Sequence, residues 1–355
     1  MNNLKLMYIL STILLIGLVL NVPLTTAFQP ASSFYISDIT WNPSGATIAF
    51  GISTSSSNTC YREPGLYAVR IINSLNGSPV NEITNVDCSV EGLDFNPIGN
   101  LLLISQLGFV QIWDLSSNQY KSGYSAANEF HNVQWSSDGS EFFIASLSGV
   151  TVITPDETVQ GGIRPIAAYT DWRETGRVTV AAWGIASTGS HPIAIGTENG
   201  TVLIWDQVSD QLLLTVSQHT SSITSVAWNT QVNQIATADE NGEIQIWDPL
   251  NGTAIHILQD HTGEITKIVW RPDGQYVASA SLDGTVRIWD AHTGMQVGIL
   301  QLTGGVYALD WSPDGSQIAY GGIFDPQNPN PIIASPPGVI TPTATTTTTP
   351  PPYDR

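Results

Sequence analysis

Apolar and polar residues alternate with a period of two along most of the chain after residue 27. The stretch SASLDGTVRIWDAHTG (279–294) shows the pattern as an alternating run, a tight turn at Asp283-Gly284 and a second run that ends at Trp289. Such alternation indicates strands with one buried face, and Asn-Gly or Asp-Gly pairs supply the positive φ that tight hairpins need. No window longer than a few residues has the 3.6-residue period of a helix. The pattern predicts an all-β chain.

The alternating runs also repeat at a regular interval. Trp205, Trp247 and Trp289 are 42 residues apart, and each is followed by Asp. A second landmark is an aromatic residue that closes a short apolar strand, usually before a tight turn. Its seven copies are Trp41, Phe95, Trp135, Trp183, Trp228, Trp270 and Trp311. Each unit contains four short strands, so the chain is a repeat protein with seven copies.

A unit of about 40 to 45 residues with four strands and a Trp-Asp ending is similar to the WD40 repeat. Residues 28–335 therefore resemble a seven-bladed WD40-like β-propeller, most clearly from Val178 to Gly321. Six or eight blades remain alternatives. The resemblance implies a structural tetrad in the sixth blade, made of His261, Ser279 or Ser281, Asp283 and Trp289. In the fifth blade His219, Thr237 and Trp247 match, and Asn241 stands where the family has Asp.

Ring closure is a second implication of the resemblance. A propeller avoids exposed sheet edges when one terminus completes the last blade. In the WD40 family this strand comes from the N-terminus, so Phe28–Ile36 is expected to be the outermost strand of the seventh blade.

The two ends of the chain differ from the repeats. Residues 1–27 carry one Lys, an apolar run from Leu6 to Leu20 and small residues before Phe28, as expected of a secretory signal peptide cleaved after Ala27. The run is too short for an ordinary membrane span, although an uncleaved anchor remains the alternative. Residues 336–355 are rich in Thr and Pro and are predicted to be a disordered tail.

The charge balance restricts the classes of partner. Without residues 1–27, which contain only Lys5 among charged residues, ten basic side chains face 30 acidic ones, a formal net charge of −20. Nucleic acids and anionic membranes are disfavoured, and a protein with a basic patch would suit this surface, although solubility alone also explains the charge. We expect a monomer that is not stably inserted in a membrane.

The two cysteines, Cys60 and Cys88, fall in the first blade. In a WD40-like propeller the two connections that carry them emerge on the same face, here called the top face. Because an exported chain meets oxidising conditions, we expect them to form a disulfide; two unpaired thiols are the alternative.

Catalytic and metal-binding motifs are missing from the sequence. No two of the six histidines have a metal-binding spacing, and there is no G-x-S-x-G or H-E-x-x-H. The acidic group Asp239, Glu240 and Glu243 lacks the order of a calcium loop. We expect neither an enzyme nor a cofactor.

Long connections on the top face are the candidate recognition surface, since function often lies on loops displayed by a rigid core. Two stretches contain the Trp, Tyr and Arg that are enriched at binding hot spots. The candidate contact residues are Tyr61, Arg62, Tyr169, Trp172, Arg173 and Arg177. For Trp172 the alternative is packing between blades. For Tyr61 and Arg62 the alternative is a loop that is closed by the disulfide and has no binding role. Turn residues are expected to make the top of blades 4–6 acidic; they are Glu198, Asp239, Glu240, Asp260 and Glu264.

The sequence thus predicts an exported, non-catalytic recognition module that binds a protein through its top face. The alternative is a propeller enzyme, or a binder of a small ligand or cation, that uses the central top pocket. A titratable cluster around the central channel would favour that alternative, and a channel lined by small and apolar residues would favour the recognition module. A structural protein of the cell surface is a third possibility.

Overall fold

The computed structural model describes residues 34–54, 67–84, 86, 88–125, 130–155, 163–169, 176–184, 191–229, 231–323 and 330–339, without the side chains of residues 54 and 163–169. These residues belong to one compact unit that begins at Phe34. All their regular elements are β-strands, and none of them forms a helix long and apolar enough to cross a membrane.

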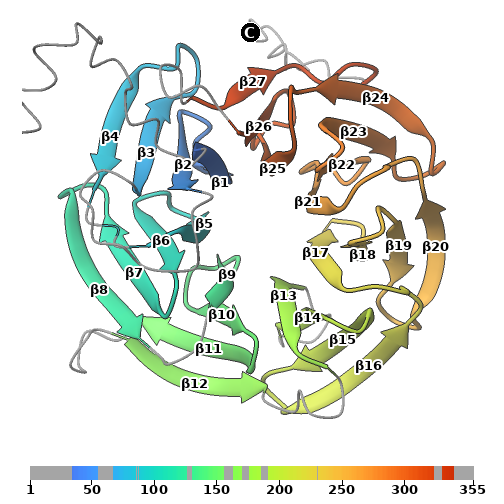
Figure 1. Ribbon diagram of the computed structural model, residues 1–355. Helices are drawn as coiled ribbons and strands as arrows, with labels where there is room; N and C mark the ends of the chain where they lie inside the picture. Colours follow the sequence, from blue (N-terminus) through green and yellow to red (C-terminus); the bar gives the residue numbers. More distant parts are fainter. Residues whose placement is uncertain are drawn as a thin grey trace, which may run out of the picture. The chain divides into compact units, whose positions relative to one another are not determined.

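Within these described residues, twenty-seven strands form seven antiparallel sheets, the blades, which follow one another around a ring (Figure 1). The strands nearest the centre are β1 (Phe34–Trp41), β5 (Val90–Phe95), β9 (Phe130–Trp135), β13 (Val178–Trp183), β17 (Ile223–Asn229), β21 (Ile265–Trp270) and β25 (Val306–Trp311). The second strands are β2 (Thr47–Thr54), β6 (Leu101–Gln106), β10 (Phe142–Ser146), β14 (Pro192–Thr197), β18 (Gln234–Asp239), β22 (Tyr276–Ser281) and β26 (Ile318–Gly322). The third strands are β3 (Ala68–Asn73), β7 (Phe109–Asp114), β11 (Gly149–Pro155), β15 (Thr201–Asp206), β19 (Ile244–Asp248), β23 (Thr285–Asp290) and β27 (Ile332–Ala334). The outermost strands are β4 (Pro79–Ile83), β8 (Gln119–Ser125), β12 (Ile163–Tyr169), β16 (Gln211–Ser217), β20 (Thr253–Leu258) and β24 (Gln296–Gln301).

This architecture confirms the predicted all-β, seven-bladed propeller. The seven landmark aromatics close the innermost strands, except that β17 continues one residue beyond Trp228. The apolar core lies between neighbouring blades. One cluster joins Ile244 of blade 5 to Val277 and Trp289 of blade 6, and another joins Ile39 of blade 1 to Ala308 of blade 7. Burial of the alternating apolar faces therefore holds each blade against the next.

A register shift recurs near the start of the innermost strands. It lies between Ile36 and Asp38 in β1 and between Ile265 and Lys267 in β21. Bulges of this kind re-aim the side chains that follow them. Asp38 and Lys267 thus have the same position in their respective blades.

The predicted closure by Phe28–Ile36 is not confirmed. Residues 34–36 belong to β1, which pairs with β2 as the innermost strand of blade 1, and residues 28–33 lie outside the described part. Its isolated β-bridge to blade 7 joins Tyr35 to Ile323, just beyond the end of β26, and Ile36 packs in the same apolar cluster as Ala319 of β26. Within the described residues, blade 7 has three strands, β25, β26 and β27.

Candidate functional site

The central channel contains a band of polar side chains that join neighbouring blades. Each of three aspartates on an innermost strand accepts a hydrogen bond from a backbone N–H of the following blade. Their donors are Leu93 N for Asp38 Oδ2 (2.8 Å), Trp135 N for Asp94 Oδ2 (2.6 Å) and Trp41 N for Asp310 Oδ2 (2.8 Å). We call Asp38, Asp94 and Asp310 the latch aspartates. They connect blades 7, 1, 2 and 3 in sequence.

Neutral side chains make the corresponding connections elsewhere in the ring. Gln134 Oε1 accepts Trp183 N at 3.0 Å between blades 3 and 4, and Ser225 Oγ accepts Ile268 N at 3.0 Å between blades 5 and 6. A charge is therefore not needed for this type of connection. The latch aspartates bring extra carboxyl groups to one side of the channel.

Lys267 is the cation among these carboxyl groups. Its Nζ lies 3.0 Å from Asp38 Oδ1, so an ion pair connects blade 6 to blade 1 past blade 7. The Lys267 side chain is 34% exposed, whereas that of Asp38 is only 5% exposed. Burial acts to lower the pKa of Lys267, but the charge and hydrogen bond of Asp38 outweigh it and leave the pKa raised. Lys267 therefore remains charged.

The other two latch aspartates ionise less readily than ordinary carboxyl groups. Burial raises the pKa of Asp94 to about 8 and that of Asp310 to about 7. Hydrogen bonds from the backbone of Trp135 and Trp41, respectively, oppose this increase. The charge of Lys267 also lowers both pKa values, whereas the charge of Asp38 raises them, because like charges disfavour ionisation.

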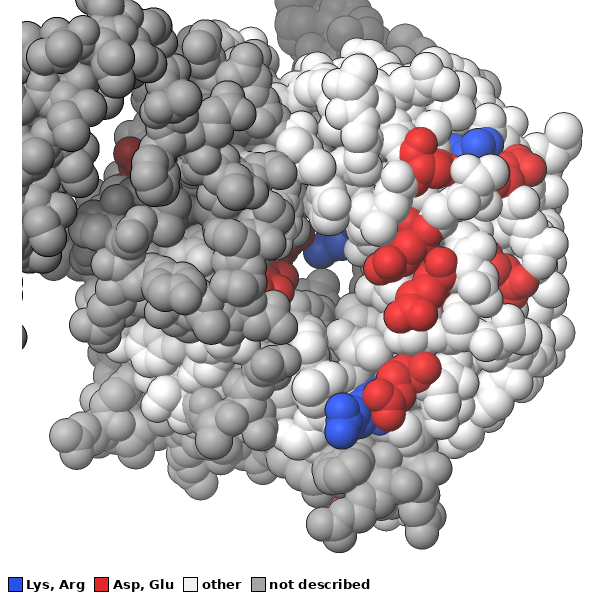
Figure 2. All heavy atoms as spheres, viewed as in Figure 1, with Lys and Arg blue, Asp and Glu red and all other residues white. Residues whose placement is uncertain are grey.

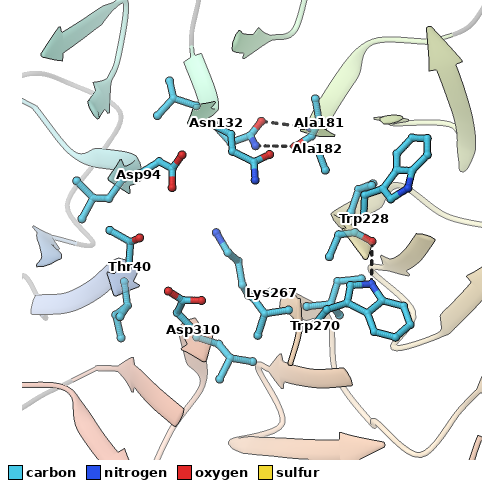
Figure 3. A pocket seen from close by; sticks show the side chains of 18 residues that line it. Thr40, Asp94, Asn132, Ala181, Ala182, Trp228, Lys267, Trp270 and Asp310 are labelled. Atoms are coloured by element: carbon cyan, nitrogen blue, oxygen red, sulfur yellow. Dashed lines mark hydrogen bonds between the residues drawn. The ribbon is translucent and has the colours of Figure 1, made fainter. Parts of the chain in front are cut away.

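These groups border a cavity of about 260 Å³ in the channel (Figure 3). The Lys267 side chain extends into the open space, with Asp94 and Asp310 on either side of its amine. The wall contributed by blades 4 and 5 includes small and apolar residues such as Ala181 and Val226. The channel thus contains both a titratable cluster and a wall of small and apolar residues. The titratable cluster is the feature expected of a small-ligand or cation site, and the apolar wall is the feature expected of a recognition module.

A second group of titratable residues lies within blade 6. Ser279 Oγ is 2.7 Å from His261 Nε2 and accepts a hydrogen bond from Trp289 Nε1 at 2.9 Å. His261 Nδ1 is 2.8 Å from Asp283 Oδ2. The structure therefore brings together His261, Ser279, Asp283 and Trp289, while the Ser281 hydroxyl binds the Gly263 carbonyl instead.

Blade 5 forms the same network with a different acid. His219 Nε2 is 2.7 Å from Thr237 Oγ1, which also accepts Trp247 Nε1 at 2.7 Å. His219 Nδ1 is 3.1 Å from the carboxylate of Asp239, not from Asn241. Asp239 was expected to add to the acidic surface, and this expectation is wrong because its side chain is only 1% exposed.

Donor atoms of His219, Asp239 and Glu243 lie within 4.8 Å of one another, a spacing that could hold a metal ion. Both His219 ring nitrogens, however, already have partners in Asp239 and Thr237. A metal ion would have to replace the proton shared between Nδ1 and Asp239. The hydrogen-bond network explains these residues without a metal.

Comparisons with known families match the part of the chain that carries these two networks. Residues 252–290 match the family described as WD domain, G-beta repeat. Residues 187–265 match the Anaphase-promoting complex subunit 4 WD40 domain. Together with the seven-bladed ring, these matches decide the family. The chain is a WD40-repeat propeller. No curated protein matches it.

Most of the contact residues predicted for this WD40 propeller are outside the described part. They are Tyr61, Arg62, Trp172 and Arg173, together with Cys60. The backbone of Tyr169 ends β12, and Arg177 is exposed before β13, where its N–H is 3.4 Å from Glu198 Oε1. Cys88 is 8% exposed and is not a free thiol. Its pairing with Cys60 stays a prediction.

Acidic side chains gather on one side of the channel opening, over blades 5 and 6 (Figure 2). Glu198, Glu240 and Asp260 are exposed in the connections of this face, and Glu264 is half-buried. Partial burial and the nearby charge of Glu240 raise the pKa of Glu264. We call Glu198, Glu240, Asp260 and Glu264 the acidic rim.

The channel groups were not recognised in the sequence, although the repeat contains the signal. Asp94 and Asp310 immediately precede a landmark aromatic, and Asp38 and Lys267 stand three residues before one. Aligning the seven copies on that aromatic would have placed all four on the channel side of innermost strands.

Proposed function

We propose that this protein is an exported WD40 scaffold that binds a basic protein partner through the top face, with the acidic rim as part of the contact. The fold supports this proposal because WD40 propellers are commonly protein-interaction scaffolds. The observation that carries it is the gathering of acidic side chains beside the channel opening, where burial and the like charge of Glu240 oppose the ionisation of Glu264. A cationic side chain placed between them would relieve that repulsion.

A crosslinking pull-down from the extracellular or envelope fraction tests the proposal. The test variant carries Glu198→Gln, Glu240→Gln and Glu264→Gln. The matched control, Glu82→Gln, Glu141→Gln and Asp273→Asn, removes three carboxylates elsewhere, and thermal melts verify that both variants are folded. We expect the rim variant to lose the partner, the control to retain it, and capture by the wild type to weaken as salt rises. Equal capture by both variants would contradict a role for the acidic rim.

A second variant tests the contact residues outside the described part. Arg62→Ala, Trp172→Ala and Arg173→Ala together are expected to weaken capture while leaving the melting temperature nearly unchanged. Loss of melting temperature without loss of capture would instead indicate that these residues pack in the fold.

Export and the disulfide can be tested on the intact protein. Cleavage after Ala27 predicts a mature chain that begins at Phe28, which N-terminal sequencing detects. The Cys60–Cys88 bond predicts a mass gain of about two hydrogens on reduction. A secreted chain that starts at Met1, or one that shows no mass change, would contradict the respective proposal.

The channel supports a second candidate function, the binding of a small cation or amine. Asp94 and Asp310 retain protons that a cationic ligand could displace, and the cavity beside Lys267 has room for a small molecule. Titration with Ca²⁺, Mg²⁺ and ethylammonium, followed by calorimetry, tests this function. Binding with proton release that is lost in Asp94→Asn would support it, and no heat with any of the three would contradict it.

A further inference from the structure

The outer edge of β27 is the one unusual edge among the described sheets. In the other six blades the third strand pairs with an outermost fourth strand, whereas β27 pairs only with β26 among the described residues. β27 is short, and Ile332 is 40% exposed. An exposed strand edge presents unpaired backbone groups and is a site for strand addition.

The residues after β27 repeat the turn that introduces a fourth strand elsewhere. In each described turn between third and fourth strands, a residue with positive φ stands one or two positions before the fourth strand. These residues are Gly77 (φ 68°), Asn118 (52°), Asp210 (52°), Gly252 (70°) and Gly294 (71°). Gly338 has φ 74° and lies four residues after the end of β27, so a fourth strand would begin at Val339.

Packing of this turn agrees with its backbone. A Cβ added at Gly252 would meet side chains of β16 in the preceding blade, and one at Gly294 would meet His256 of β20. A Cβ at Gly338 would lie 2.1 Å from the Val297 carbonyl oxygen of β24, again in the preceding blade. Val339 then packs against the apolar cluster between blades 6 and 7. Gly338 therefore occupies the place of the other turn residues.

We infer that the outer edge of β27 binds the segment Val339–Thr345 of the same chain, which completes blade 7. The sequence VITPTAT suits this position, since Val, Ile and Thr favour strands and Pro is tolerated in an edge strand. In this arrangement each blade consists of four consecutive strands, and residues before Phe34 take no part in the ring. This differs from the N-terminal closure implied by family resemblance.

Connection lengths argue against the N-terminal alternative. The shortest described spacing between a fourth strand and the next first strand is four residues, as in 302–305 between β24 and β25. A strand before β1 would therefore end by residue 29, and five residues of it would span 25–29. Cleavage after Ala27 would cut that strand in two. Rejection of N-terminal closure therefore rests on the proposed export.

Truncations of the full chain separate the two closures. Deleting 340–355 is expected to lower the melting temperature by at least about 4 °C, whereas deleting 347–355 or 1–30 should change it by no more than about 1 °C. The opposite result, with loss only on deleting 1–30, would show N-terminal closure. No loss with any deletion would also overturn the inference, because β27 would then need no strand from this chain.

A matched pair of substitutions tests strand pairing without shortening the chain. Ile340→Pro removes a backbone N–H within the closing segment, and Thr348→Pro makes the same change beyond it. Hydrogen exchange in Ile332–Ala334 should accelerate at least about tenfold in Ile340→Pro and stay unchanged in Thr348→Pro. Failure of this site-specific acceleration would overturn the inference even if the truncated chain does not fold. A pull-down with Ile340→Pro is expected to retain the partner, so this outcome is distinct from failure of the proposed function.

Discussion

Blades 5 and 6 are held together differently from blades 7, 1 and 2. In blades 5 and 6, a hydroxyl on the second strand binds both a histidine and the tryptophan of the third strand, and the histidine also binds an aspartate at the top-face turn. In blades 7, 1 and 2, an aspartate reaches from the innermost strand to the backbone of the next blade. The first device strengthens a blade, whereas the second strengthens the seam between blades. One propeller can therefore combine family-typical repeats with divergent ones, because the divergent blades have another source of cohesion.

Removal of a tetrad tryptophan should have the largest effect. Trp289 is 2% exposed, and Trp289→Ala is expected to lower the free energy of unfolding by about 3–5 kcal/mol through loss of core packing. Trp289→Phe isolates the hydrogen bond, because it leaves the Ser279–His261 pair without its indole donor, at a cost of about 1–3 kcal/mol. Denaturant unfolding measures both.

Trp113 of blade 2 is the matched control. Its Nε1 donates to Gln111 Oε1 of the same strand at 2.5 Å, whereas the indole of Trp289 donates to a hydroxyl that also binds a histidine. Trp113→Phe should therefore cost less than Trp289→Phe. Equal losses would contradict the idea that the tetrad contributes more than the packing of its indole.

The two regions should respond to pH in opposite directions. Burial raises the pKa of Asp94 to about 8 and of Asp310 to about 7, so their contribution is greatest below the unfolded pKa of about 4 and is lost as pH rises through the folded values. Burial lowers the pKa of His219 and His261, so their contribution is present above about pH 6.5 and is lost as pH falls. Hydrogen exchange at pH 5.5 and 9 should show weakening of blades 5 and 6 at the lower pH and of the blade 7–1–2 seams at the higher one.

Asp94→Asn sharpens the alkaline half of this comparison. Asparagine retains an acceptor for Trp135 N–H but has no proton to lose. Between pH 6 and 9 the wild type should lose at least about 1.4 kcal/mol more stability than the variant, the equivalent of one pKa unit. Identical slopes in denaturant unfolding would show that Asp94 does not titrate in this range.

The sequence predicted the tetrads better than the channel for a physical reason. Strands, hairpins and the His261 network depend on residues within one repeat, so their spacing is visible along the chain. The contact of Asp310 with Trp41 joins residues 269 positions apart and depends on closure of the ring. The ion pair between Lys267 and Asp38 likewise joins residues 229 positions apart, so it too depends on closure of the ring.

Blade 5 shows how an exchange of two positions misled the sequence comparison. Its turn has Asp239 and Asn241 where blade 6 has Ser281 and Asp283, and the carboxylate reaches the histidine from the earlier position. The expected loss at Asn241 therefore did not remove the acid from the network. It moved the acid two residues along the hairpin.

Substitutions at the two exchanged positions include the smallest predicted effect, at Asn241. Asp239→Asn should cost about 1–3 kcal/mol, because its amide would present a donor to His219 Nδ1–H. Asn241→Asp should change stability by no more than about 0.5 kcal/mol, since the acid is already supplied by Asp239. The double variant Asp239→Ser, Asn241→Asp copies blade 6 and should be more stable than Asp239→Ser alone. If thermal and denaturant unfolding show no such recovery, the two hairpins hold their histidines in different geometries, and the equivalence of the two networks does not extend to their turns.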